Sequence, residues 1–365
     1  MEICERCIVP SSFPHVTFED GLCTFCRNHD ESPKLAKESL GSKTLLQRLK
    51  SKPSRSKYDC VVALSGGKDS SYVLYFTVRK LGLNPLAVFF DNGFVTHFAT
   101  DNIRNICKAL GVDVVVRKAT AYRAKLLKEH LAISGFTGNQ FYACFNCENN
   151  LRTSVINEAV DRGIPFILWG STTFEDPFTT FLNTTSGSWR EARKANTVHL
   201  LDTLKRLFIE PLFQPIKSGN RLSFYYHHLL SRYYMVRDNF AMHTPEGWRN
   251  LSPYLNVSFD GKGPEVIYFF DYIQYNPPQM VATLQQEIGW TAPKNKEARV
   301  DCKLGCFGNY HHLKRTGITK DGFTFSVLVR HGLLSRADAL KKEETVKDGL
   351  AEECDRVRQE IISRC

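Results

Sequence analysis

The sequence predicts an α/β fold with a mainly parallel, doubly wound sheet, a small N-terminal cysteine module and a mostly helical C-terminal region. Short apolar runs alternate with stretches of helical spacing between residues 58 and 170, and two Cys-x-x-Cys pairs precede them. Alternating strands and helices are typical of a parallel sheet covered by helices on both faces. Ligands of such folds bind at the carboxyl ends of the strands, so we look for functional residues there.

The first expected strand, Tyr58–Leu64, is followed by a loop and by helical spacing from Ser71 to Leu81. Glycines let a loop approach a bound anion closely, and a helix N-terminus offers unpaired N–H groups and a positive dipole end. We therefore expect a pyrophosphate site, with Lys68 as a point charge and Asp69 as a ligand of Mg²⁺. A Gly-Gly turn with a chance lysine is the alternative. The candidate ATP-binding residues are Ser65, Gly66, Gly67, Lys68, Asp69 and Ser70.

The pattern S-G-G-x-D-S at the end of a first strand resembles the PP-loop of the ATP pyrophosphatases. It lacks the first glycine and the spacing of the G-x-x-x-x-G-K-S/T loop. The resemblance implies an adenine nucleotide alpha hydrolase-like fold. It also implies an enzyme that cleaves ATP between the α and β phosphates, passes AMP to a substrate oxygen and releases pyrophosphate, with Lys68 and Asp69 as catalytic residues.

Polar residues also end or follow other expected strands, which lie at residues 84–93, 113–116 and 164–170, with a helix across Ala99–Leu110. Asp91 is near the end of the second strand, at an edge where ligands are expected. Gly170, after the fourth strand, permits close approach of a nucleotide, and Ser171 begins a run of hydroxyls and carboxylates that could meet ribose or metal. We take Asp91, Gly170 and Ser171 as further ATP contacts. A polar loop without a ligand is the alternative reading for the fourth strand.

Four N-terminal cysteines have the spacing of a structural zinc site. Two Cys-x-x-Cys knuckles give the tetrahedral sulfur cage that Zn²⁺ takes, with no open coordination position, so we expect the metal to fold the module. A redox or iron role is the alternative. The four ligands are Cys4, Cys7, Cys23 and Cys26.

A second set of cysteines lies farther along the chain. Cys144 and Cys147 open an expected helix, whose dipole and free N–H groups favour thiolates, so the pair is reactive or liganding. Cys302 and Cys306 lie among basic residues, which also favour thiolates. A second zinc site of four thiols is the structural alternative. Two cysteines on apolar elements are expected to be inert core residues, and two near the C-terminus have no assigned role: Cys60, Cys107, Cys354 and Cys365.

The zinc-type cysteines and the PP-loop together look like the N-acetyl sugar amidotransferases of surface-polysaccharide pathways. The likeness covers roughly the first 120 residues and returns at Gly289-Trp290 and around Gly332 to Leu340. It implies that ammonia from a partner glutaminase displaces AMP from the acetamido group of a sugar, which gives an acetamidino sugar.

The position of Cys144-x-x-Cys147 ahead of the fourth strand is similar to the tRNA 2-thiouridine synthetases and related PP-loop sulfurtransferases. That resemblance implies a [4Fe-4S] cluster on Cys144, Cys147 and a third cysteine, Cys302 or Cys306, with one open iron that delivers sulfide from a sulfur donor. Cys306 is then an extra ligand or a persulfide carrier. The C-terminal zinc module of those enzymes is not found, which favours a small-molecule or sugar acceptor over tRNA.

Composition sets the expected surroundings of the chain. Its 365 residues are 42% apolar, enough for two domains or for one large domain with an appendage. No signal-peptide order and no apolar run near the ~18 residues of a membrane span occur, so we expect a cytoplasmic protein without a membrane partner. A net charge of +10 suits tRNA or nucleotide phosphates, although a solvated linker and helix face explain it equally well. A homodimer is left open.

We therefore expect four segments: a zinc module (1–32), a basic linker (33–57), a PP-loop domain (58–215) and a mostly helical region that completes the active site (216–365). The predicted activity is adenylation of a substrate oxygen followed by replacement of AMP with sulfur. The alternatives are an N-acetyl sugar amidotransferase and a zinc-bearing module that binds nucleotide or RNA without turning it over.

Overall fold

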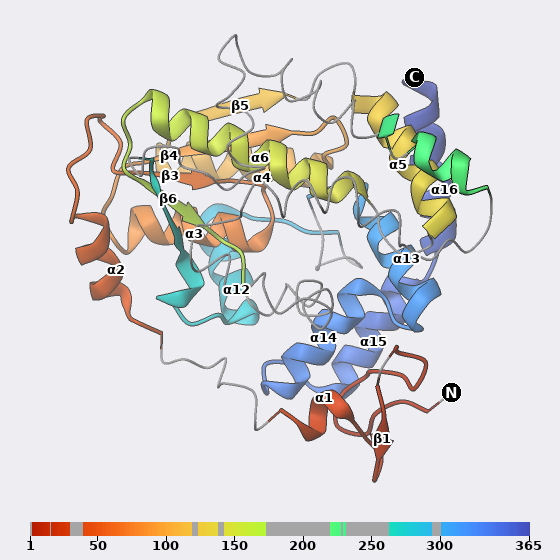
Figure 1. Cartoon of the computed structure of the whole chain (residues 1–365). Helices are drawn as coiled ribbons and strands as arrows, with labels where there is room; N and C mark the ends of the chain where they lie inside the picture. The colour runs from red at the N-terminus through yellow and green to blue at the C-terminus, as the bar shows by residue number, and fades with distance from the viewer. Residues whose placement is uncertain are drawn as a thin grey trace.

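The computed structural model describes residues 2–14, 16–29, 39–118, 123–137, 142–172, 220–227, 229–230, 263–293 and 301–365. Across these residues the chain has a central five-stranded sheet, helices on both of its faces, a largely helical C-terminal region and an N-terminal cysteine module (Figure 1). No helix in these ranges combines the length and the hydrophobicity that a membrane crossing requires.

The sheet has the strand order β5-β4-β3-β6-β7, and all four pairings are parallel. β3 and β6 are buried along their whole length, as expected for strands covered on both faces. The register of β3 pairs Val61 with Leu86 on one side and with Ile167 on the other. The predicted parallel sheet is confirmed. Its strands are β3 (Cys60–Ala63), β4 (Pro85–Asp91), β5 (Val114–Lys118), β6 (Phe166–Trp169) and β7 (Glu265–Tyr268).

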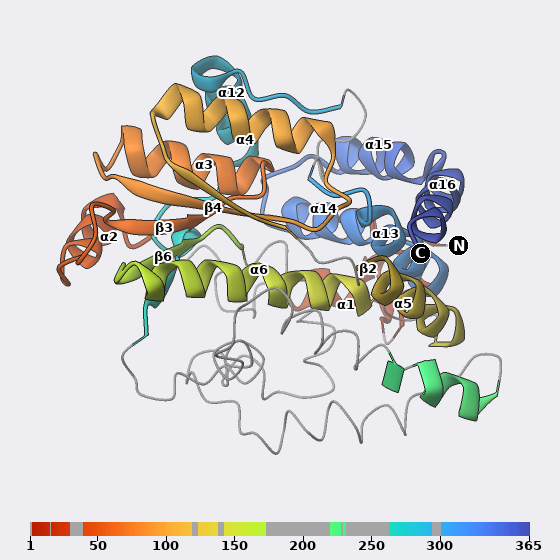
Figure 2. The same ribbon diagram turned by 90° about the horizontal axis from the view of Figure 1, so that it is seen from above.

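Helices cover the two faces of the sheet unequally. On one face α3 (Lys68–Arg79) packs between α4 (His97–Leu110) and α12 (Pro277–Ile288), while on the other α6 (Tyr142–Asp161) crosses β3, β4 and β6 (Figure 2). The doubly wound arrangement predicted from the alternation of elements is therefore present. Because β3, β4 and β6 are parallel, their carboxyl ends lie at one edge of the sheet, and the loops that follow these strands lie there too.

The fifth strand comes from a segment that was expected to be mostly helical. β7 has only four residues and is followed by a 3-10 turn, Phe269–Asp271, so its sequence carries little strand signal. Glu265 on β7 accepts a hydrogen bond from Arg48 (2.9 Å) and pairs with Lys52 (3.2 Å), which ties β7 to α2 (Ser42–Leu49) and the end of the basic segment. The expected domain boundary near residue 215 lies outside the described residues.

The C-terminal helices form the platform on which the N-terminal module lies. Phe323 stacks on Phe13 with ring centroids 4.9 Å apart and meets Phe25 edge-on at 5.5 Å, so the module shares an apolar core with α14 and α15. α5 packs beside α16 (Figure 1). The elements are β1 (Phe18–Glu19), β2 (Leu22–Cys23), α1 (Thr24–Arg27), α5 (Arg123–Thr137), α13 (Gly305–Thr316), α14 (Lys320–Arg330), α15 (Arg336–Lys347) and α16 (Leu350–Ser363).

Candidate nucleotide site and cysteine clusters

The predicted PP-loop lies between β3 and α3, and α3 begins at Lys68, three residues earlier than the sequence pattern indicated. Ser70 is therefore in the first helical turn. Its hydroxyl accepts a hydrogen bond from the Ser65 N–H (3.1 Å) and lies 3.2 Å from the Ser65 hydroxyl, so the loop curls over the start of the helix. The first N–H groups of a helix have no intrahelical partner. Because Ser65 is bonded to Ser70, the loop lies next to these N–H groups at the start of α3.

Gly66 is fixed by a close approach to α4. Its φ is +81°, and a Cβ at this position would lie 2.4 Å from the carbonyl oxygen of Ala99. Its own carbonyl accepts hydrogen bonds from Asn102 Nδ2 (3.2 Å) and Trp290 Nε1 (3.0 Å). Asn102 is also bonded in both directions to the backbone of Thr291, at 2.9 Å each. The loop is thereby locked to α4 and to the chain that follows α12.

Lys68 and Asp69 form an ion pair at the start of α3. Lys68 Nζ lies 2.8 Å from Asp69 Oδ2, and the two side chains are only 13% and 16% exposed. The ammonium also lies 5.7 Å from the ring centroid of Tyr275. Both charged groups are thus largely shielded from solvent. A phosphate group bound here would compete with Asp69 for the lysine, and a magnesium ion would compete with Lys68 for the carboxylate.

The end of β6 lies against the same helical turn. A Cβ at Gly170 would be 3.2 Å from Val73 Cγ2 and 3.5 Å from the backbone nitrogen of Ser70. The expected proximity of Gly170 to the loop is therefore seen. Ser171 accepts a hydrogen bond from Trp169 Nε1 (2.6 Å), and Asp91 Oδ1 accepts one from the Gly93 N–H (2.9 Å). The ATP contacts assigned to these residues stay predictions.

Sequence reasoning missed Asp301, Asn102 and Trp290 as neighbours of the loop. Asp301 Oδ2 would lie 3.8 Å from a Cβ at Gly67, which places a second carboxylate beside the glycine pair. The sequence indicates a role for the Gly289-Trp290 pair only through a family resemblance. Nothing in the local pattern of these residues says that they meet a loop more than 30 positions away.

Residues 301–303 reach the loop by pairing with residues 94–96. The Thr96 N–H donates to the Asp301 carbonyl (3.3 Å), the Lys303 N–H donates to the Phe94 carbonyl (2.9 Å), and Val95 and Cys302 form an antiparallel bridge. This short pairing places Cys302 beside the loop that follows β4, so a cysteine from late in the chain joins the carboxyl edge of the sheet.

Cys302 and Cys147 meet at a single side chain. The amide nitrogen of Asn92 lies 3.3 Å from Cys302 Sγ and 3.4 Å from Cys147 Sγ. Both cysteines therefore contact one side chain, and their role as ligands stays a prediction. Cys144 belongs to the first turn of α6, but its side chain lies outside the described part of the structure.

Cys306 has a different partner from the one predicted. It is buried in the cluster formed by α13 and α16, where a hydrogen bond with Cys354 and burial raise the pKa of its thiol. Cys60 and Cys107 lie in the main core as expected. Burial raises the pKa of both thiols, that of Cys107 to about 11, which makes them poor thiolates at neutral pH.

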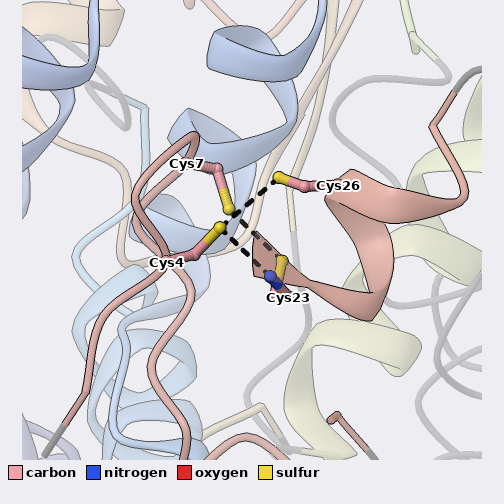
Figure 3. Close-up of side chains that lie close together, drawn as sticks. All are labelled: Cys4, Cys7, Cys23 and Cys26. Carbon is pink, nitrogen blue, oxygen red and sulfur yellow. Dashed lines mark hydrogen bonds between the residues drawn. The ribbon is translucent and has the colours of Figure 1, made fainter. Parts of the chain in front are cut away.

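The four N-terminal cysteines converge as predicted and could hold a metal ion (Figure 3). Their sulfur atoms all lie within 4.8 Å of one another, and each residue is at most 1% exposed. Cys4 Sγ accepts a hydrogen bond from the Cys23 N–H (3.3 Å) and Cys7 Sγ accepts one from the Val9 N–H (3.5 Å). Four sulfurs this close cannot all be thiolates without a cation, so the donor set fits Zn²⁺ or another thiophilic metal.

Arg336 of α15 connects this cluster to the C-terminal helices. Its Nε donates to the carbonyl oxygens of Cys4 (3.1 Å) and Cys7 (3.0 Å), the two residues of the first knuckle. The orientation of the knuckle therefore depends on a residue more than 300 positions away, and the module is part of the C-terminal core rather than a separate appendage.

Comparison with known proteins gives distant similarities. No family model matches the chain. A curated relative, an uncharacterized protein from Methanocaldococcus jannaschii, is 32% identical over 119 residues, which is 31% of this chain and 41% of that protein. The chain thus spans less than half the length of the relative, and that relative carries no described activity.

Three solved structures are also similar. They are NMN synthetase from Francisella tularensis (20% identity, TM-score 0.26, 33% of this chain and 48% of that one), NH3-dependent NAD synthetase from Campylobacter jejuni (14%, 0.28, 56% and 94%) and U34-tRNA thiolase NcsA from Methanococcus maripaludis with its [4Fe-4S] cluster (14%, 0.34, 91% and 89%). Likenesses this distant do not say which reaction the chain catalyses.

Replacing Gly66 by alanine is expected to destabilise the protein more than the same change at Gly82. Both glycines have a positive φ, +81° and +66°, so each variant loses the roughly 1–2 kcal/mol that a side chain costs in the left-handed region. Only at Gly66 does the new Cβ also meet backbone, whereas nothing lies within 4 Å of one at Gly82. Urea unfolding of the two variants measures the difference, and equal losses would contradict the close packing of the loop on α4.

The cluster of four N-terminal cysteines is expected to bind one zinc ion per chain. Cys4→Ser and Cys7→Ser should each lose that ion and lower the thermal stability of the module, because zinc-dependent modules draw their folding free energy from the metal. Cys365→Ser removes an exposed thiol elsewhere and should retain zinc. Elemental analysis that finds zinc retained in a Cys4/Cys7 double variant would show that the metal is bound elsewhere.

Proposed function

We propose that the protein is an ATP-dependent PP-loop enzyme that adenylates a substrate oxygen and then replaces AMP with sulfur. The observation that supports sulfur transfer is the meeting of Cys147 and Cys302 at Asn92, directly after β4. Asp301, the neighbour of Cys302, lies beside Gly67 of the loop. Two thiols are thus near the loop on which the nucleotide would bind, where an incoming nucleophile is needed.

In the proposed first step an oxygen of the acceptor attacks the α-phosphorus of ATP. The bond from that phosphorus to the oxygen bridging the β-phosphate breaks, and pyrophosphate leaves. Ser65, Gly66, Gly67 and Ser70 would bind the phosphates through hydroxyl and backbone N–H donors. Lys68 would neutralise the charge on the leaving pyrophosphate, and Asp69 would hold Mg²⁺. Asp91, Gly170 and Ser171 would line the rest of the nucleotide site.

In the second step hydrosulfide attacks the adenylated carbon, the carbon–oxygen bond breaks, and AMP leaves with the oxygen. A sulfur donor at the oxidation level of sulfide supplies the nucleophile, so no external oxidant or reductant is consumed. Cys144, Cys147 and Cys302 would hold a [4Fe-4S] cluster, which would supply an open iron for sulfide. The acceptor proposed is a small molecule or a sugar.

The second candidate is an N-acetyl sugar amidotransferase, in which ammonia from a glutaminase partner replaces sulfide. The contact of Trp290 with the Gly66 carbonyl favours it, because Gly289-Trp290 belongs to the stretch that resembles that family. In this alternative Cys144, Cys147 and Cys302 would have no role in the chemistry, and the closed zinc site of four thiols that the sequence suggested is disfavoured by the contact of Cys306 with Cys354. A binding module without turnover is the third alternative.

Lys68→Ala and Asp69→Ala are expected to lower pyrophosphate release by about 100-fold or more, the usual effect of removing a group that stabilises developing charge. The assay would use ATP and Mg²⁺, with a small-molecule extract as the source of the acceptor. Lys80→Ala, at the other end of the same helix, is the matched control and should retain activity. Formation of ADP and phosphate by the unmodified protein would contradict the proposed cleavage between the α and β phosphates.

Anaerobic purification is expected to yield a brown protein with about four iron atoms per chain in addition to one zinc ion, as one [4Fe-4S] cluster requires. Cys147→Ser and Cys302→Ser should lose iron and retain zinc, because neither residue belongs to the four-cysteine N-terminal cluster. Cys306→Ala is the informative comparison and should retain iron, since its thiol is paired with Cys354. A colourless protein with two zinc ions and no iron would favour the amidotransferase instead.

A further inference from the structure

Asn92 follows the last residue of β4 and has its side-chain amide fixed by the loop. Its Oδ1 accepts a hydrogen bond from the Phe94 N–H at 2.8 Å, and the residue is only 7% exposed. A backbone N–H can bond only to the oxygen of the amide, so the orientation of the group is determined. The NH₂ group must then face Cys147 and Cys302.

The amide has two N–H bonds and two sulfur atoms within reach. Nδ2 lies 3.4 Å from Cys147 Sγ and 3.3 Å from Cys302 Sγ, so one hydrogen is available for each sulfur. A thiol is a weak acceptor, whereas an anionic sulfur accepts a charge-assisted hydrogen bond. The two donors therefore suit anionic sulfur atoms such as those of cysteines that ligate a metal.

Asn92 and Cys302 are placed by neighbouring backbone bonds of the same short pairing. Lys303 N–H donates to the carbonyl of Phe94 at 2.9 Å, and the neighbouring Val95 bridges to Cys302. The bond that orients Asn92 and the bond that places Cys302 thus involve the same residue, Phe94. A change in the position of the amide would shift both the donor and one of the sulfur atoms.

In the N-terminal cluster the N–H donors to sulfur have a different source. Cys4 and Cys7 of that cluster accept N–H···S hydrogen bonds from the backbone of Cys23 and Val9, where a change of side chain does not remove the donor. At Cys147 and Cys302 the donor is a side chain. Hydrogen bonds to sulfur raise the reduction potential of an iron–sulfur cluster, and partners of the ligands set metal affinity.

We propose that Asn92 is a positioning residue that aligns Cys147 and Cys302 as ligands and raises the reduction potential of the cluster through two N–H···S hydrogen bonds. The inference rests on the proposed function, because it takes these cysteines as cluster ligands. It assigns to Asn92 no contact with the reacting atoms.

The test compares Asn92→Asp, Asn92→Leu and Asn84→Asp in anaerobically purified full-length protein. Asn92→Asp keeps the acceptor for Phe94 but loses both donors, and Asn92→Leu loses the acceptor as well. Asn84→Asp makes the same chemical change at the other end of β4, where the amide donates to the Lys57 carbonyl at 2.8 Å. Iron, acid-labile sulfide and zinc are counted, and the midpoint potential is measured by a redox titration followed by electron paramagnetic resonance.

Both Asn92 variants should have a more negative midpoint potential than the wild type and release iron to a chelator at about 10–100-fold lower concentration, while Asn84→Asp matches the wild type. Retained zinc in the N-terminal cluster would show that the variants are folded. Wild-type potential and iron retention in Asn92→Asp would overturn the role of Asn92 and leave the proposed function intact. A wild-type protein without iron would overturn the proposed function itself, and this inference with it.

Discussion

The hydrogen bonds to the carbonyl of Gly66 are the contact on which the rest of the site depends. A loop that is to present N–H groups to an anion must turn its carbonyl oxygens away, and a buried carbonyl needs donors. Asn102 and Trp290 supply them from two different elements, and both residues are nearly fully buried, 1% and 2% exposed. The close contact of Gly66 with Ala99 restricts the loop further. Its conformation is therefore determined by α4 and by the chain that follows α12.

The limits of several helices could be predicted because their signals are local. The limits of α12 are an example: Asn276 caps the helix by accepting from the Gln279 N–H (3.2 Å), two prolines begin it, and Gly289 ends it with φ +65°. The same holds for α15, where the Ser335 hydroxyl accepts from the Asp338 N–H at 3.0 Å. Each of these contacts spans three residues or fewer, so composition and spacing record it.

The parts that could not be predicted depend on contacts between distant residues. β7 is a strand because β6 offers it an edge, and four residues with one buried position do not show that edge in their sequence. The positions of Asp301 and Cys302 beside the loops depend on the pairing of residues 94–96 with 301–303, which no local pattern in the sequence indicates. The sequence pattern could group Cys302 and Cys306 by their spacing, but the helix start at Gly305 turns Cys306 toward Cys354 instead.

The two cysteine groups differ in a way that bears on their chemistry. The N-terminal group is complete with four buried sulfurs, it is clamped by Arg336 against the C-terminal core, and a metal bound there would have no open position. The group at Asn92 includes two sulfurs that are partly exposed, at the carboxyl edge of the sheet and beside the PP-loop. A metal with four thiolate ligands has no open position for a further ligand, whereas a metal held by fewer thiolates could bind one. The number of sulfurs at Asn92 is therefore the physical quantity that separates sulfur transfer from amidation in this fold.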